Sequence, residues 1–274
     1  MKNHIIFFSG GLASFAVAHL VKERNPNDNI VLLFTDTLFE DEDLYRFIKE
    51  ASDKLQLPLL TLTDGRTPLD LMTKRKFLFN SRIADCSTTL KVKPAKDLII
   101  KGIYTENHHW RNHGYLRDEN YLDNPTLYFG ISYDEIHRQA SIVRNWQPFR
   151  VEMPLIDTVI DKKELLKQYE IDIPQLYKLG FTHNNCKGRC IKGGQGHWLN
   201  LLNSDYVSFC EMRDFEVMMN NIINAKNGTI GIKYSFMKKQ GKSYTLQDLE
   251  NDKKNRPEQL DIFDFGACGC FVDE

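Results

Sequence analysis

The chain has 274 residues, of which 42% are hydrophobic and 27% charged, and its formal net charge is -1. This is an ordinary globular composition, and the near-neutral balance excludes a protein whose whole surface is basic for nucleic acid or anionic membranes. No apolar run reaches the roughly 18 residues of a membrane span, and the first residues lack the cleavage region of a signal peptide. We therefore expect a cytoplasmic protein with no membrane partner.

Buried strands alternate with helices in the first half of the chain. Apolar, β-prone runs and amphipathic spacing predict strands at residues 4–8, 30–34, 59–62 and 127–130, and helices at 14–23 and 42–55. Such alternation with short connections is typical of right-handed parallel crossovers. We predict an α/β fold over residues 1–155, with an open parallel, Rossmann-like sheet that binds its ligand beyond the carboxyl ends of the strands.

The second half is predicted to be mostly helical. Helical patterns occur at residues 162–169, 174–179, 196–203 and 206–224, around a cysteine-rich loop. No internal repeat or low-complexity linker separates the two halves. We therefore expect residues 156–274 to form a helical, Cys-rich region packed on the first domain.

A glycine-containing loop follows the first predicted strand. Residues 9–14 read SGGLAS and lead into a predicted helix. Glycines let the backbone turn tightly and approach a ligand, and the N-terminus of a helix presents N–H groups to an anion. The hydroxyls of Ser9 and Ser14 can add donors. A plain strand-to-helix turn with a serine cap would have the same sequence, so the segment alone leaves both interpretations open.

Four ordered segments carry a family resemblance. The loop is similar to the Ser-Gly-Gly-x-Asp-Ser loop of N-type ATP pyrophosphatases and phosphoadenylyl-sulfate (PAPS) reductases, with Ala13 at the place of the Asp. Residues 34–37 resemble the second-strand Asp-Thr of these reductases. Residues 82–94 resemble their Cys-Cys-x-x-x-Lys-x-x-Pro segment, and residues 130–138 resemble a later Gly-x-x-x-x-x-Ser-x-Arg block. Over about residues 4–155 the chain thus resembles the PP-loop, or adenine nucleotide alpha-hydrolase-like, superfamily and its PAPS reductase-like members.

This resemblance implies a site for ATP or a related adenine nucleotide, together with Mg²⁺. The implied nucleotide contacts are Ser9, Gly10, Gly11, Ser14, Asp36, Thr37, Gly130, Arg82 and Lys93. Catalytic roles fall to Asp36, Lys91 and Arg138, because a carboxylate can bond a ribose or hold Mg²⁺ and cationic groups suit phosphate or sulfate. Asp36 could instead cap a turn, and exposed lysines and arginines are often only solvated.

The cysteines form two closely spaced pairs. Cys186 and Cys190 are separated by three residues, and Cys268 and Cys270 by one. Two such pairs suit a tetrahedral zinc site, although small buried thiols would show the same spacing. The reductase resemblance implies another grouping, a [4Fe–4S] cluster held by Cys86, Cys186, Cys190 and one tail cysteine. The Glu-Cys-Gly-x-x-His ending that carries the reacting thiol in those reductases is absent here.

Three functions are compatible with these features. The leading one is an enzyme that adenylates a substrate with release of pyrophosphate, used in sulfur transfer to a nucleic-acid or protein partner. The second is a sulfonucleotide reductase with a tail thiol as nucleophile. The third is a nucleotide-binding or nucleotide-sensing protein without catalysis, in a phage- or defence-related role. A small-molecule nucleotide is the expected ligand in all three, and a homodimer is left open.

Overall fold

The chain folds as two compact units, each with its own core. A computed structural model describes residues 1–80, 83–103, 109–110, 112–264 and 266. One unit contains Met1–Gly65 and Ser87–Gln175, and the other contains Arg66–Cys86 and Leu176–Gly269. The domain boundary expected near residue 155 remains a prediction. Among the described helices, none is long and apolar enough to cross a membrane.

A mostly parallel sheet is the centre of the first unit. Its described strands are β1 (Asn3–Phe7), β2 (Asn29–Asp36), β3 (Leu59–Thr63), β4 (His109–Trp110), β5 (Thr126–Tyr128) and β6 (Val151–Glu152). They lie in the order β4-β3-β2-β1-β5-β6, and β4 pairs antiparallel with β3 while the other pairs are parallel. Every residue of β2 and β3 is buried, because a parallel sheet is covered on both faces.

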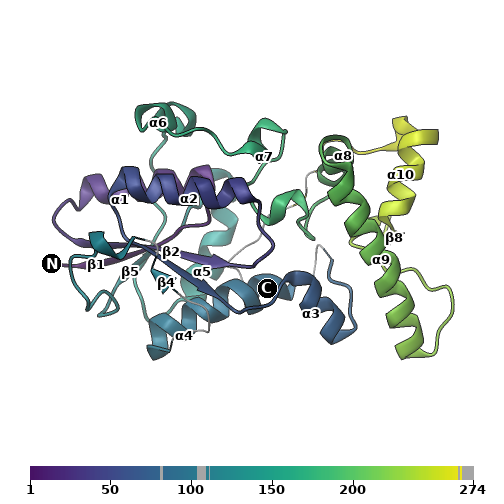
Figure 1. Ribbon diagram of the computed structural model, residues 1–274, viewed down its shortest axis with the longest axis horizontal. Coiled ribbons are helices and arrows are strands. Elements are labelled where there is room, and N and C mark those ends of the chain that lie inside the picture. Colours follow the sequence, from purple (N-terminus) through teal and green to yellow (C-terminus); the bar gives the residue numbers. More distant parts are fainter. Residues whose placement is uncertain (81–82, 104–108, 111, 265, 267–274) are drawn as a thin grey trace. The chain divides into compact units, whose positions relative to one another are not determined.

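Helices cover both faces of this sheet (Figure 1). One face packs on α1 (Leu12–Arg24) and α2 (Glu42–Leu55), with α6 (Lys162–Gln168) packed on α1, and the other face packs on α4 (Lys93–Lys101) and α5 (Gln139–Asn145). The alternation of side chains along β1 separates the two cores: Ile6 and Phe8 face α1 and α2, whereas Ile5 and Phe7 face α4 and α5. The sheet is therefore a rigid platform whose strand ends position the connecting loops.

The second unit is built mainly from helices. It contains α3 (Pro68–Arg75), α8 (Gln195–Ser204), α9 (Tyr206–Asn227) and α10 (Leu246–Asn255), with the antiparallel hairpin β7 (Met237–Lys239) and β8 (Lys242–Tyr244). Its core includes Trp198, which stacks on Phe236 at 5.5 Å between ring centroids. Within this core Glu216 is almost completely buried and accepts the backbone N–H groups of Phe236 and Leu246 at 3.0 and 2.7 Å. One side chain of α9 thereby ties the hairpin and the start of α10 together.

Short helices complete the two units. They are the π-helix η1 (Ser87–Val92), the 3-10 helices η2 (His113–Tyr115), η3 (Tyr133–Arg138), η4 (Cys186–Gly188) and η5 (Pro257–Gln259), and the single turn α7 (Gln175–Lys178).

The predicted fold class is confirmed. The expected parallel α/β sheet and the helical C-terminal part are both present, and the helix predicted at residues 42–55 has the bounds of α2. The structure adds β6, α4 and α5, which the sequence patterns did not predict.

Candidate functional site

The loop of residues 9–14 lies at the topological switch point of the sheet. From β1 the chain passes to β2 and β3 on one side, whereas β5 and β6 lie on the other side. Connections that leave β1 and β5 therefore diverge, which opens a crevice beyond the carboxyl ends of these strands. The backbone N–H of Phe8 donates to the carbonyl of Leu33 at 2.8 Å, so the loop starts only after the pairing of β1 with β2 ends.

Glycines and serines shape this loop. Gly10 has a φ of +75°, and a Cβ placed on it would lie 2.9 Å from Leu44 and from Ile48 of α2, so both backbone conformation and packing require glycine. The Ser14 hydroxyl donates to the Gly11 carbonyl at 2.9 Å, and the Ser9 hydroxyl donates to Ser14 at 3.3 Å. These bonds hold the first turn of α1 closed.

The amino end of α1 has the electrostatics of an anion site. Gly11 stands at the N-cap position with extended backbone, and it has no side chain that could cap the helix. The first turn contains no acidic residue, because Ala13 stands where the resembling loops carry Asp. The partial positive charge of the helix terminus is thus not neutralised by a carboxylate of that turn.

Gly130 packs directly against the first turn of α1. It follows β5, and a Cβ placed on it would lie 2.9 Å from the backbone nitrogen of Ser14 and 3.1 Å from the carbonyl carbon of Ala13. Its φ lies outside the left-handed region, so the close approach alone demands glycine here. The structure therefore brings together Ser9, Gly10, Gly11, Ser14 and Gly130 of the predicted site.

Asp36 is the last residue of β2 and is 6% exposed. Its Oδ1 accepts the backbone N–H of Leu38 at 2.8 Å and the hydroxyl of Tyr45 at 2.9 Å. Burial and the neighbouring Asp36 carboxylate raise the pKa of Tyr45 above its usual range, so Tyr45 keeps its proton and remains the donor. The side chain of Asp36 is thus held in one orientation at the carboxyl edge of the sheet.

A buried ion pair lies beside Asp36. The ammonium of Lys91 is 3.8 Å from Oε1 of Glu40, and that oxygen accepts the hydroxyl of Thr37 at 2.9 Å. Lys91 and Glu40 are both buried, and Lys91 belongs to the π-helix η1. π-Helical turns occur frequently at functional sites, and this one directs a lysine from a distant part of the chain to the loop after β2. Glu40 and Tyr45 belong to this arrangement although the sequence analysis did not select them.

The remaining predicted cations have carboxylate partners. Arg138 is 13% exposed at its side chain and pairs with Glu135 in η3. Lys93 is more exposed and pairs with Asp97 of α4. The phosphate-binding roles of Arg138 and Lys93 stay predictions. Arg82 lies outside the described residues.

The loop before α8 that carries Cys186 and Cys190, here called the cysteine loop (residues 183–194), belongs to the second unit. Cys190 is buried, Cys186 and Cys86 are partly buried, and the described cysteines are thiols. The loop is held by His197, whose Nε2 bonds the Gly188 carbonyl at 2.8 Å, and burial lowers the pKa of His197 to about 4. Within the described part of the chain, no three His, Cys, Asp or Glu side chains are placed to hold a metal ion. The predicted ligands Cys268 and Cys270 lie outside that part.

The segment before the tail cysteines packs on this loop. The backbone N–H of Gly196 donates to the carbonyl of Asp264 at 2.7 Å. A Cβ placed on Gly266 would lie 2.3 Å from the carbonyl oxygen of Lys192 and 2.6 Å from the nitrogen of Gly194. A Cβ on Gly194 would likewise lie 2.4 Å from the carbonyl oxygen of Asp264, so glycines are required on both sides where the C-terminal segment crosses the loop.

These features define a doubly wound α/β protein with a glycine-containing strand-to-helix loop at its switch point. The family model described as phosphoadenosine phosphosulfate reductase domain matches residues 3–186, which is more than half of the chain. The chain therefore belongs to the phosphoadenosine phosphosulfate reductase domain family, as the sequence resemblance predicts.

Comparison with solved structures found the crystal structure of phosphoadenylyl-sulfate (PAPS) reductase from Candida auris in a phosphate complex. That match covers 66% of this chain and 78% of the other at 14% sequence identity, with a TM-score of 0.40. No curated protein matches the chain.

Proposed function

We propose that the chain is an enzyme that binds ATP, or a related adenine nucleotide, with its phosphates against residues 9–14. The observation that carries this proposal is the approach of Gly130 to the backbone of Ser14, where a Cβ would lie 2.9 Å from the nitrogen. A glycine at a position of ordinary φ lets the chain after β5 pack directly against the first turn of α1, so both segments border the carboxyl edge of the sheet where such folds bind ligands. The family membership of residues 3–186 supports the same ligand class.

The proposed reaction transfers the adenylyl group. A nucleophile of the acceptor attacks the α-phosphorus, a new bond to phosphorus forms, and the bond between the α-phosphorus and the bridging oxygen to the β-phosphate breaks. Pyrophosphate leaves with the electron pair of that bond. The N–H groups at the start of α1 would stabilise the negative charge on the leaving group, since fixed donors at developing charge lower the barrier.

Asp36 is the residue that fits Mg²⁺ in this proposal. Carboxylate oxygens at a strand end are the hard ligands that Mg²⁺ prefers, and Tyr45 holds the side chain in place. When bound, the ion would neutralise charge on the phosphates. Lys91 would act by fixing the loop after β2 through Glu40, and Arg138 would contact the phosphates.

The assay for this proposal follows both products of ATP cleavage. ATP labelled on the α-phosphate is incubated with candidate acceptors, including tRNA, DNA and small carboxylates, and pyrophosphate is quantified in parallel. Adenylated acceptor and pyrophosphate in equal amounts would support the reaction. Nucleotide binding without pyrophosphate from any acceptor would instead favour the nucleotide-sensing function.

Sulfonucleotide reduction is the second candidate. It is supported by the family and by Gly266, which lies against Lys192 and Gly194 only two residues before Cys268. The assay measures sulfite released from PAPS by the wild type and by the variants Cys268→Ser and Cys270→Ser. Release that is lost in the variants would establish this reaction, and unchanged release in both would exclude a tail nucleophile.

A further inference from the structure

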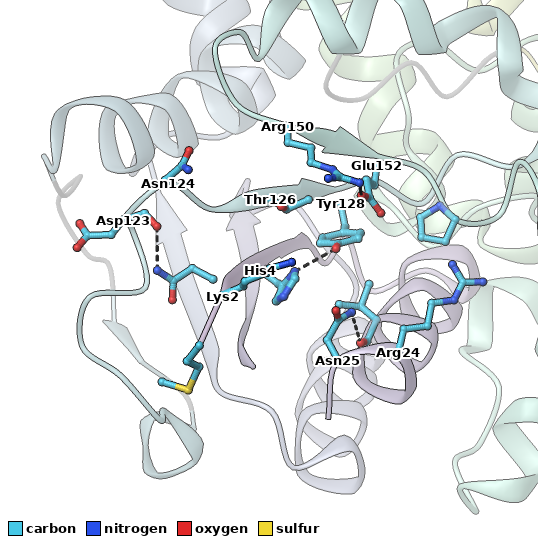
Figure 2. A pocket seen from close by; sticks show the side chains of 14 residues that line it. Lys2, His4, Arg24, Asn25, Asp123, Asn124, Thr126, Tyr128, Arg150 and Glu152 are labelled. Atoms are coloured by element: carbon cyan, nitrogen blue, oxygen red, sulfur yellow. Dashed lines mark hydrogen bonds and ion pairs between the residues drawn. The ribbon is translucent and has the colours of Figure 1, made fainter. Parts of the chain in front are cut away.

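A polar pocket is lined by the amino end of β1 and by residues of α1, β5 and β6 (Figure 2). Its volume is about 540 Å³, which is within the range of small-molecule sites. His4 of β1 lines it, and the five residue-to-residue steps from His4 to Ser9, at about 3.3 Å each, span roughly 16 Å. The pocket and the loop are therefore separate places on the same sheet.

A buried hydrogen-bond chain forms one wall of the pocket. His4 is 3% exposed; its Nδ1 lies 3.0 Å from the hydroxyl of Tyr128, and its Nε2 lies 3.1 Å from Oδ2 of Asp28. The Asp28 carboxylate can only accept, so Nε2 of the ring donates to it, and when the ring carries this one proton Nδ1 accepts the Tyr128 proton. Burial, followed by the Glu152 carboxylate, raises the pKa of Tyr128 to about 12, which keeps that proton on the phenol. The Tyr128 oxygen is left as an acceptor toward the pocket.

Charged groups from four parts of the chain line the same pocket. Lys2, Arg24 and Arg150 supply cations, while Glu152 and Asp123 supply carboxylates. Arg24 donates one N–H to the Thr158 hydroxyl at 2.8 Å, and Arg150 pairs with Glu152 at 2.6 Å. A guanidinium has five N–H donors, so each of these contacts uses only part of its donor set. Cationic donors thus stand next to the acceptors Tyr128 and Glu152.

We propose that this pocket binds a small phosphorylated molecule that also carries hydroxyl groups, such as a sugar phosphate. Arg24, Arg150 and Lys2 would bind the phosphate, because guanidinium groups fit phosphate oxygens with paired hydrogen bonds. Glu152 and the Tyr128 oxygen would accept hydrogen bonds from the hydroxyl groups. The mixed lining selects against a bare anion, since the two carboxylates repel an anion that brings no donors.

Because the His4 ring lines the pocket, its NMR signals report binding there without an activity assay. Ribose 5-phosphate is titrated into the full chain labelled on histidine, and the ring signals of His4 are followed by NMR. We expect a saturable shift of His4 that persists when ATP is already present in excess. Arg24→Gln combined with Arg150→Gln should raise the Kd at least about tenfold, because two charge-assisted contacts are lost. Tyr128→Phe, which keeps the buried ring, should raise the Kd about fivefold or more.

The control variant is Arg144→Gln, which removes an exposed arginine of α5 that does not line the pocket and should leave the Kd unchanged. Inorganic phosphate and ribose, tested separately, should each bind at least about tenfold more weakly than ribose 5-phosphate. The proposal is overturned by a His4 signal that does not move, or by equal affinity of the double arginine variant and the wild type. Equal affinity for inorganic phosphate, or loss of the shift when ATP is present, would overturn it as well.

Discussion

Replacing Gly130 by Ala tests the geometry of the loop with one added carbon. The new Cβ would lie 2.9 Å from the nitrogen of Ser14 and 3.1 Å from the carbonyl carbon of Ala13. Ordinary contacts of carbon with such atoms begin near about 3.5 Å, so the first turn of α1 must move by roughly half an ångström. Overpacking of this kind costs about 1–3 kcal/mol. If the cost falls on the nucleotide-binding geometry, the affinity for ATP drops about 5- to 150-fold.

The assay is calorimetric titration of ATP into the wild type and the variant, with thermal unfolding measured on the same samples. Gly114→Ala is the matched control, because no atom lies within 4 Å of a Cβ at Gly114 and its φ is ordinary. We expect Gly114→Ala to bind ATP like the wild type. If Gly130→Ala also binds ATP with wild-type affinity, the nucleotide does not depend on the geometry of the first turn of α1, and the proposed site is wrong.

Three further predictions concern other parts of the chain. Burial raises the pKa of Glu216 from 4.5 to about 7, so the folded state holds this proton more tightly, and the free energy of unfolding should fall by about 3 kcal/mol as the pH rises from 4.5 to 7. Glu216→Gln should remove this pH dependence in chemical denaturation, and an unchanged slope between pH 4.5 and 7 would refute the assignment. Lys91→Met should destabilise the fold by about 3–5 kcal/mol, because it leaves Glu40 buried without its ammonium partner. Adding Glu40→Gln should restore part of this loss in chemical denaturation, and simple additivity of the two changes would show that the two side chains do not interact. If the cysteines hold a metal, anaerobically purified protein should contain zinc or iron near stoichiometry, and the variant Cys186→Ser should lose it. A wild-type protein with full activity and no metal would show that these cysteines only contribute to packing.

The sequence was most informative about the fold where burial is continuous. Strands β2 and β3 are buried along their whole length, and such apolar runs between turn signals are readily assigned. By contrast, β6 has two residues, and α4 begins directly from the π-helix η1 with Pro94 at its second position. Neither element has a pattern long enough to be distinguished from a loop.

The candidate site was predictable only where it is local in the chain. The loop of residues 9–14 and Asp36 follow strands, so their meeting at one edge of the sheet is a consequence of parallel topology. The partners of Asp36 and Lys91 depend on packing between elements: Tyr45 comes from α2, and Glu40 meets a lysine of η1. His4 similarly occupies a core position of β1, and only the structure shows the contacts with Asp28 and Tyr128 that allow its burial.

The most direct test of the central claim is amide NMR of the full chain during titration with ATP and Mg²⁺. The account predicts that the largest shifts fall on residues 9–14 and on Gly130, saturate together, and are reduced in Gly130→Ala. Saturable binding whose shifts leave these residues unchanged, or the absence of any binding of adenine nucleotides, would contradict it.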